Sequence, residues 1–481
     1  MRAPGPRLAR RLARHLVAPM LALSAVLATP AAAQPMLSPH VGGLTFLGPA
    51  TVHPTAVFYN PAALSPLPDT QLFVASQVRL DRGEITRDPI DPASGQPDPA
   101  GSLRPAATPI SFAALEGFAA LTSGFGRATF ALAVSTPGAE QGSFAATGEG
   151  PGGAVRYHRV SQSVRDTYFS LGVGIKVTNR LHAGLALSYA LTSFDLGFMR
   201  DTALERGSAG LAGDCAGVPC GVENPAAGEL IELDTAEQLL TFNGGVLASP
   251  RDGIWLGLSY LPPLGAGGLT TEGSARVTSP GGAVAVGRAA IQSDRPQRVM
   301  LGARFELNEC TFLGVNLTWF GWQRARELDL RLFGVELRAA GVPERIVRHR
   351  GFQDAYAGEV VLDHRWSDLL RYGASIGVAT SAVPQQAVNA GALDAPRGEV
   401  TGSIELSAGR AVITAGYGLI LRLPRQVSPG VDDPQATVRC VDGGFDLDLC
   451  EDVRLGRGRP SAAGEYSWLT HELSLGIGFR F

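Results

Sequence analysis

Apolar and polar residues alternate strictly along much of the chain, most clearly between residues 166 and 177. There Phe169, Leu171 and Val173 fall on one face, while Ser170 falls on the other. A period of two residues predicts β-strands, and strands of about 9 to 11 residues cross a bilayer when tilted. The pattern predicts about fourteen such strands. They span residues 70–82, 108–121, 127–136, 163–178, 181–195, 235–249, 253–264, 291–307, 311–325, 356–366, 369–380, 398–408, 411–423 and 467–481.

Short and long connections alternate between the predicted strands. Asn179-Arg180, for example, joins two strands as a two-residue turn. Outer-membrane barrels have short periplasmic turns and long outer loops, and an even number of strands. The pattern therefore predicts an all-β fold, a transmembrane antiparallel β-barrel. Long connections are expected at 83–107, 138–162, 197–234, 265–290, 326–355, 381–397 and 424–465, and the stretch 265–290 could instead hold hairpin extensions.

The last segment of the chain, Trp468 to Phe481, alternates in the same way and ends on an aromatic residue. It is typical of the closing strand of an outer-membrane barrel, although a strand of a soluble sandwich could alternate similarly. We expect the terminal Phe481 to contact the machinery that assembles barrels in the outer membrane.

The first 33 residues predict a cleaved secretory signal peptide. They have an arginine-rich start, an apolar run from Leu16 to Ala28 and small residues at 31–33. We expect the mature chain to begin near Gln34 and to lie in the outer membrane of a Gram-negative bacterium. No later run of 18 or more apolar residues is present, so the sequence offers no membrane-spanning helix.

Composition favours one large β structure. The chain has 60 glycines among 481 residues and only 18% charged residues, which suits a single glycine-rich barrel, expected at 70–481, better than several soluble domains. A net charge of −3 gives no support to nucleic-acid binding.

Residues 34–69 do not alternate and contain seven prolines. So many prolines exclude a central strand or a long helix. We expect an irregular plug, or hatch, inside the barrel lumen. A disordered leader is the alternative.

Here the sequence resembles a known family. The stretch GGLTFLGPATVHPTAVFYNPAALSPLPDTQL is similar to the N-terminal signature of the FadL-type transporters, with Asn60, Pro61 and Ala62 matching their Asn-Pro-Ala motif. Residues 295–328 resemble a later hairpin of the family, and FQDAYAGEVVLDHRWSDLLRYGASIGVATSAVP resembles the next pair of strands. The chain departs from the family where the hatch usually carries an acidic residue, because it has His53 and its neighbours there.

The resemblance implies passive uptake of long-chain fatty acids or other lipids and hydrocarbons, with exit sideways through a gap at a kinked third strand. The third strand of this chain has Gly124 and Gly126 at its start and Pro137-Gly138 at its end. These residues do not locate a kink within the strand. We expect a monomer without a cofactor, with lipopolysaccharide and membrane lipids as neighbours and a hydrophobic small molecule as substrate.

Alternation places three candidate substrate-binding cations, Lys176, Arg304 and Arg422, toward the lumen. They could pair with a carboxylate head group, or they could be solvated or paired with other lumen charges. The arginine-rich loop 324–350 could collect anionic amphiphiles, contact lipopolysaccharide phosphates, or simply be solvated.

Five cysteines in an exported chain suggest disulfides. Cys215 with Cys220 and Cys440 with Cys450 lie close in sequence, so we expect two local loop disulfides and a free thiol at Cys310. No histidine lies at ligand spacing from either pair, so no metal site is expected.

Other functions remain as alternatives. A structural or adhesive barrel and a general-diffusion porin are two of them, although a plugged lumen argues against the porin. A lipid-modifying enzyme would need a Ser/His constellation. The eight histidines are scattered, and only His364 lies near a Ser-Asp pair, at Ser367-Asp368. We therefore expect no catalytic residues.

Overall fold

The computed structural model describes residues 48–89, 106–137, 140–144, 152–202, 227–264, 268–325, 327–428 and 461–481. The predicted disulfide cysteines, the signal peptide and residues 34–47 lie outside these ranges.

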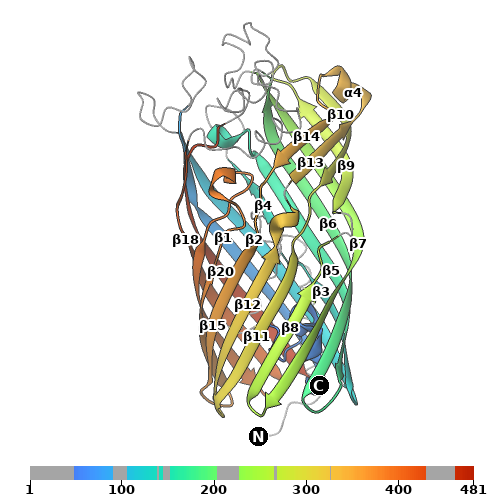
Figure 1. Ribbon diagram of the computed structural model, residues 1–481, viewed down its shortest axis with the longest axis vertical. Coiled ribbons are helices and arrows are strands. Elements are labelled where there is room, and N and C mark those ends of the chain that lie inside the picture. Colours follow the sequence, from blue (N-terminus) through green and yellow to red (C-terminus); the bar gives the residue numbers. More distant parts are fainter. Residues whose placement is uncertain are drawn as a thin grey trace.

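The described residues form one closed antiparallel barrel with fourteen wall positions (Figure 1). Several positions are built from two strands in line. In chain order they are β1 (Thr70–Arg87); β2 (Ala106–Phe125); β3 (Ala128–Ser135) with β4 (Glu140–Ser143); β5 (Ser161–Lys176); β6 (Leu181–Asp201); β7 (Gly228–Arg251); β8 (Ile254–Leu261) with β9 (Thr270–Thr278); β10 (Val284–Gln292) with β11 (Gln297–Asn308); β12 (Thr311–Gly321) with β13 (Glu327–Phe333); β14 (Arg345–His349) with β15 (Ala355–Arg365); β16 (Leu370–Ala379); β17 (Arg397–Ala408); β18 (Ala411–Arg422) with β19 (Arg425–Val427); and β20 (Gly464–Arg480).

Pairing of the first and last strands closes the barrel, from Gln71 opposite Arg480 to Arg87 opposite Gly464. The short helices are α2 (Ala56–Tyr59), η1 (Pro61–Leu64), η2 (Gly153–Val155), η4 (Trp322–Arg324), α4 (Val335–Ala339) and η5 (Gln385–Ala387). No helix among the described residues is both long and apolar enough to cross a membrane.

The predicted barrel and its antiparallel strand order are confirmed, but two of the long connections were predicted wrongly. The stretch 265–290 contains β9 and most of β10, which matches the alternative of hairpin extensions. The stretch 326–355 contains β13, α4 and β14 rather than one loop. These pieces continue the wall beyond the predicted strands and surround an apolar cluster of their own, which includes Leu330 and Ile291.

The outer surface of the barrel is apolar, as a lipid-facing wall requires. Leucines such as Leu171, Leu185 and Leu317 are exposed on it. Exposed aromatic residues mark both ends of this apolar band, with Tyr189, Tyr260 and Tyr356 toward the long loops and Phe125, Trp366 and Phe481 at the short turns. Such aromatic girdles are typical of membrane barrels.

Two apolar clusters fill the lumen at different heights. The floor cluster, toward the turn end, joins the N-terminal segment 48–69 to the inner faces of the strands. The roof cluster, toward the loop end, includes much of the inner loop, which we define as residues 381–396 between β16 and β17. The inner loop was expected at 381–397 as an outer loop, yet Val383, Val388 and Ala395 in it are fully buried.

Candidate functional site

The floor of the lumen depends on Asn60. Its Nδ2 donates to the carbonyls of Pro49 at 2.6 Å and Val246 at 3.0 Å, and its Oδ1 accepts from Ala62 N–H at 3.1 Å. Asn60 thereby caps η1, whose first residue is Pro61, a combination that favours a helix start. One side chain thus shapes the segment and joins it to the wall at β7.

Glycines let the wall approach this segment closely. A Cβ on Gly184 would lie 2.2 Å from the backbone nitrogen of Ala62, and one on Gly257 would lie 2.0 Å from the carbonyl oxygen of Pro49. Contacts this short are sterically forbidden, so only glycine fits at these positions with the segment in place.

Polar groups hold the upper surface of the floor. The carbonyl of Phe58 accepts from Asn243 Nδ2 at 2.6 Å and from Arg298 Nη2 at 3.2 Å. In the same segment, His53 Nδ1 lies 2.8 Å from Thr55 Oγ1. Burial lowers the pKa of His53 to about 3, and the positive charges of Arg371 and Arg480 contribute to that shift. His53 is therefore neutral near pH 7.

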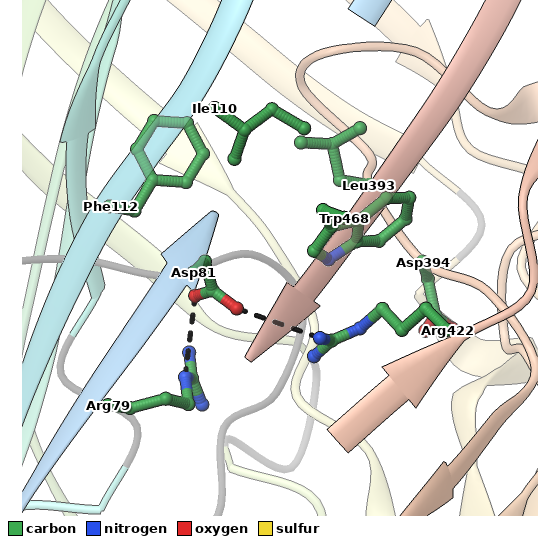
Figure 2. A pocket seen from close by; sticks show the side chains of 8 residues that line it. All are labelled: Arg79, Asp81, Ile110, Phe112, Leu393, Asp394, Arg422 and Trp468. Carbon is green, nitrogen blue, oxygen red and sulfur yellow. Dashed lines mark ion pairs between the residues drawn. The ribbon is translucent and has the colours of Figure 1, made fainter. Parts of the chain in front are cut away.

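A small pocket lies above the floor, at the edge of the roof cluster (Figure 2). Ile110, Phe112, Leu393 and Trp468 supply its apolar side. Arg79, Asp81, Asp394 and Arg422 supply its polar side. The strands β1, β2, β18 and β20 and the inner loop thus all contribute to one pocket.

The polar side of the pocket is a network of charges. Asp81 lies between two arginines, with Oδ2 at 3.6 Å from Arg79 Nε and Oδ1 at 3.6 Å from Arg422 Nη1 (Figure 2). Thr470 donates to Asp81 and accepts from Arg422 Nη1. The guanidinium of Arg422 also lies 5.3 Å from the centre of the Trp468 ring.

Asp394 anchors the inner loop across the pocket. Its Oδ2 accepts from Ala382 N–H at 2.7 Å and from Ser381 Oγ at 3.2 Å, while its Oδ1 accepts from Ala395 N–H at 2.9 Å. These bonds fix the fold of the loop, which then places Leu393 against the pocket.

The third wall position is interrupted beside the pocket. β3 pairs with β5 up to Ser135 opposite Tyr168, and β4 resumes at Glu140 opposite Val164. Between these two pairs, the third position has four residues in the sequence and β5 has three. Pro137, which has no N–H to donate, lies in this interruption.

Beyond the interruption, β4 stays paired with β5 but is displaced toward the lumen side of β2. The last described backbone bond between the third position and β2 runs from Thr136 N–H to the carbonyl of Gly117, at 2.9 Å. A Cβ on Gly142 of β4 would lie 2.4 Å from the ring of Phe112, which faces the pocket. Among the described residues, β2 therefore has no ladder partner on this side from Glu116 to Ala106.

Several solved structures have the same fold. A FadL homologue from Pseudomonas aeruginosa superposes with a TM-score of 0.73 at 15% identity, over 93% of this chain and 100% of that one. The Ralstonia pickettii toluene transporter TbuX gives 0.61 at 12% identity, over 94% and 98%. The chain has the FadL-type fold. The P. putida toluene transporter TodX gives 0.60 at 14% identity, over 92% and 96%. The sequence matches no protein-family model and no curated protein.

Within the FadL-type barrel, the three predicted lumen cations lie apart. Arg422 lines the pocket. Lys176 lies at the turn end, opposite His182, and Arg304 stacks on the ring of Phe312 at 4.0 Å, close to the same end. Sequence reasoning missed Arg79 and Asp81. Asp81 is the charge partner of Arg422 in the pocket, and Arg79 pairs with the same aspartate. Their signal was alternation on strand one, where both side chains fall on the inner face.

The arginine-rich segment is largely self-neutralised where it is described. Asp329 binds both Arg331 at 3.2 Å and Arg345 at 3.0 Å, and Arg338 binds Glu344 at 2.8 Å. This pairing leaves less charge for anionic amphiphiles or lipopolysaccharide phosphates. Cys310 has no disulfide partner among the residues that the structure describes.

The histidine and serine side chains that could suggest an enzyme all have structural partners. His364 Nδ1 lies 2.9 Å from Thr311 Oγ1, and Ser367 Oγ accepts from the backbone N–H of Leu370 at 3.1 Å. A G-x-S-x-G pattern that the sequence analysis overlooked, at 373–377, lies inside β16. Its Ser375 Oγ pairs with Thr401 Oγ1 at 2.6 Å, so the pattern forms no strand-to-helix turn of the hydrolase type.

Proposed function

We propose that the chain is an outer-membrane channel for passive uptake of hydrophobic compounds, with exit sideways through the wall. The observation that carries this proposal is the position of the pocket. It lies above the floor cluster and beside the stretch of β2 that, among the described residues, lacks a partner on the β3 side. The similar structures include toluene transporters and a FadL homologue, which supports uptake as the function.

The physical reason for a sideways exit is the environment below the pocket. Straight below it, a hydrophobic compound would meet the buried polar residues Gln77 and Glu116 and then the packed floor. Apolar surface gains about 25 cal/mol for each Å² when it moves from water to an apolar environment, and buried polar groups do not provide that environment. The interruption of the third position lies at the height of Glu116. In this proposal the compound leaves there, toward the lipid.

The N-terminal segment acts as the hatch in this proposal. It occupies the lumen through Asn60 and the glycine contacts, and residues 34–47, outside the described ranges, would precede it. A filled lumen disfavours the general-diffusion porin. The bonded states of Ser375 and His364 disfavour a lipid-modifying enzyme, and we propose transport without catalysis.

Uptake and conductance together test the proposal. Cells that express the intact protein, or a version lacking residues 34–69, would be given radiolabelled oleate and toluene, and both proteins would be measured in planar bilayers. We expect uptake with the intact protein and high ionic conductance only after the deletion. Absence of uptake of both compounds, together with large conductance of the intact protein, would indicate an open porin.

A further inference from the structure

The charges around the pocket point to a particular head group. Resting on the uptake function proposed above, we infer that the pocket binds the hydroxyl of an uncharged amphiphile, such as a long-chain alcohol, in preference to a carboxylate. The carboxylate is what the lumen cations alone would suggest, because an arginine considered without its neighbours is an anion site.

The pocket already contains its own anions. Two arginines and two aspartates line it, so their formal charges sum to zero. The next charges add no positive excess. Arg397 pairs with Glu399 at 3.8 Å, and the charge of Arg425, which acts on Asp394, is matched by Glu472 opposite Arg79 on β20. A carboxylate entering the pocket would bring an uncompensated negative charge into a buried site.

Direct pairing with the arginines would also require a displacement. Asp81 lies between Arg79 and Arg422, and a carboxylate could take that place only by leaving Asp81 without its partners. Asp81 is itself buried. Leaving one buried anion unpaired in order to pair another has a large desolvation cost, and the number of ion pairs does not increase.

A hydroxyl group avoids both costs. Among the described residues, the hydrogen bond and ion pair of Arg422 both use Nη1, so Nε and Nη2 can still donate. Asp394 takes three hydrogen bonds, and a carboxylate offers about four acceptor positions. A hydroxyl can therefore accept from Arg422 and donate to Asp394 without a change in charge.

The size of the pocket agrees with a small head group. Its free volume for water-sized groups is about 20 Å³, and a cavity of about 10 to 15 Å³ is enough for one water molecule. A hydroxyl oxygen has about that size. The apolar body of the ligand would lie along Ile110, Phe112 and Leu393, on the side where β2 lacks a partner.

A matched pair of ligands tests the inference. 1-Dodecanol and dodecanoate have the same chain and differ in the head group. Binding of each to the purified full-length protein would be measured by displacement of a fluorescent lipid probe in nanodiscs, at about pH 9, where the carboxylate is ionised. We expect the alcohol to bind about tenfold more tightly than the carboxylate.

Removing one acidic group should shift this preference. Asp81→Asn leaves Arg79 and Arg422 without their shared counter-charge, so dodecanoate should gain about tenfold relative to the alcohol. Asp394→Asn should shift the ratio in the same direction by a smaller factor, and it serves if Asp81→Asn does not fold. Asp363→Asn is the control, because Asp363 is also a buried aspartate paired with an arginine, Arg371, but near the turns. It should leave the ratio unchanged.

Tighter or equal binding of dodecanoate by the wild-type protein would overturn the inference, as would an unchanged ratio in both pocket variants when they fold. These results leave the proposed uptake untouched if cells still take up toluene and oleate. Conversely, a preference for the alcohol in a protein that takes up neither compound would support the pocket assignment and contradict the uptake function.

Discussion

The floor and the roof of the lumen are both apolar, but they are built in opposite ways. The structure of the floor depends on glycines, which have no side chains, and on contacts made by the backbone. Glycines at 184 and 257 let the wall touch the N-terminal segment, and Asn60 fixes that segment through carbonyl groups. The roof is specified by side chains that fill space around a charged pocket. The difference fits the proposed roles, a hatch below and a binding region above.

The largest expected effect comes from adding a methyl group to the floor. Gly257→Ala would place a Cβ 2.0 Å from the carbonyl of Pro49, which cannot yield without moving the segment. Overpacking of this kind costs about 1 to 3 kcal/mol, so we expect ionic conductance in planar bilayers to rise roughly tenfold or more.

Gly124→Ala is the control for this variant. Gly124 also lies beside the segment, but its nearest neighbours would be 3.7 Å from the new Cβ. Its conductance should stay at the wild-type value. Equal conductance of the two variants would contradict the close-contact account of the floor.

A smaller effect is expected from Asn60→Ala, which removes three hydrogen bonds at the floor. A hydrogen bond contributes about 0.5 to 1.5 kcal/mol net, and some of these groups can rebond, so a severalfold rise in conductance is expected. Asn389→Ala provides the comparison in the roof, where Asn389 bonds Ala387 and Gly391. If the roof asparagine affected conductance as much as Asn60, floor and roof would not differ as proposed.

The smallest expected effect is that of pH. The pKa of His53 is lowered from 6.5 to about 3, chiefly by burial. Above about pH 6.5 the segment is unaffected, because His53 is neutral whether the segment is seated or released. As the pH falls below 6.5, the released state takes up a proton and the seated state does not, so seating weakens. Conductance should therefore rise as the pH falls from 6.5 to 4.5. His53→Gln should abolish this rise, and an unchanged pH response in that variant would exclude His53 as its cause.

The wall was predictable from the sequence where one face meets lipid and the other meets the lumen. Residues 166–177 and 181–191 alternate because the lipid selects every second side chain, and both lie in observed strands. Beyond the membrane this selection ends, and β9 and β13 lie in regions where the pattern predicted loops. Strict alternation of apolar and polar residues therefore predicts only the part of the wall that faces lipid.

The pocket was less predictable. Arg422 was singled out as an inward cation, but its charge partner Asp81 comes from the opposite end of the chain, and only barrel closure through β1 and β20 brings the two together. The interruption of strand three was also hidden. Pro137 suggested the end of a strand, whereas the strand resumes at Glu140 on a different path. The path of β4 depends on how the third position pairs with β5, where four residues separate the two pairs on one side and three on the other. The local sequence does not reveal this pairing.

The most direct test of the account is to repair the third wall position. Deleting Pro137 leaves three residues between Ser135 and Glu140, equal to the three of β5 between Val164 and Tyr168. It also removes the residue without an N–H, so we expect the strand to continue in the wall and pair with β2. A structure of the variant would verify the repair. Uptake of toluene and oleate by cells should then be lost, while ionic conductance stays low because the floor is intact. Undiminished uptake through a continuous third strand would contradict exit through the wall at this position.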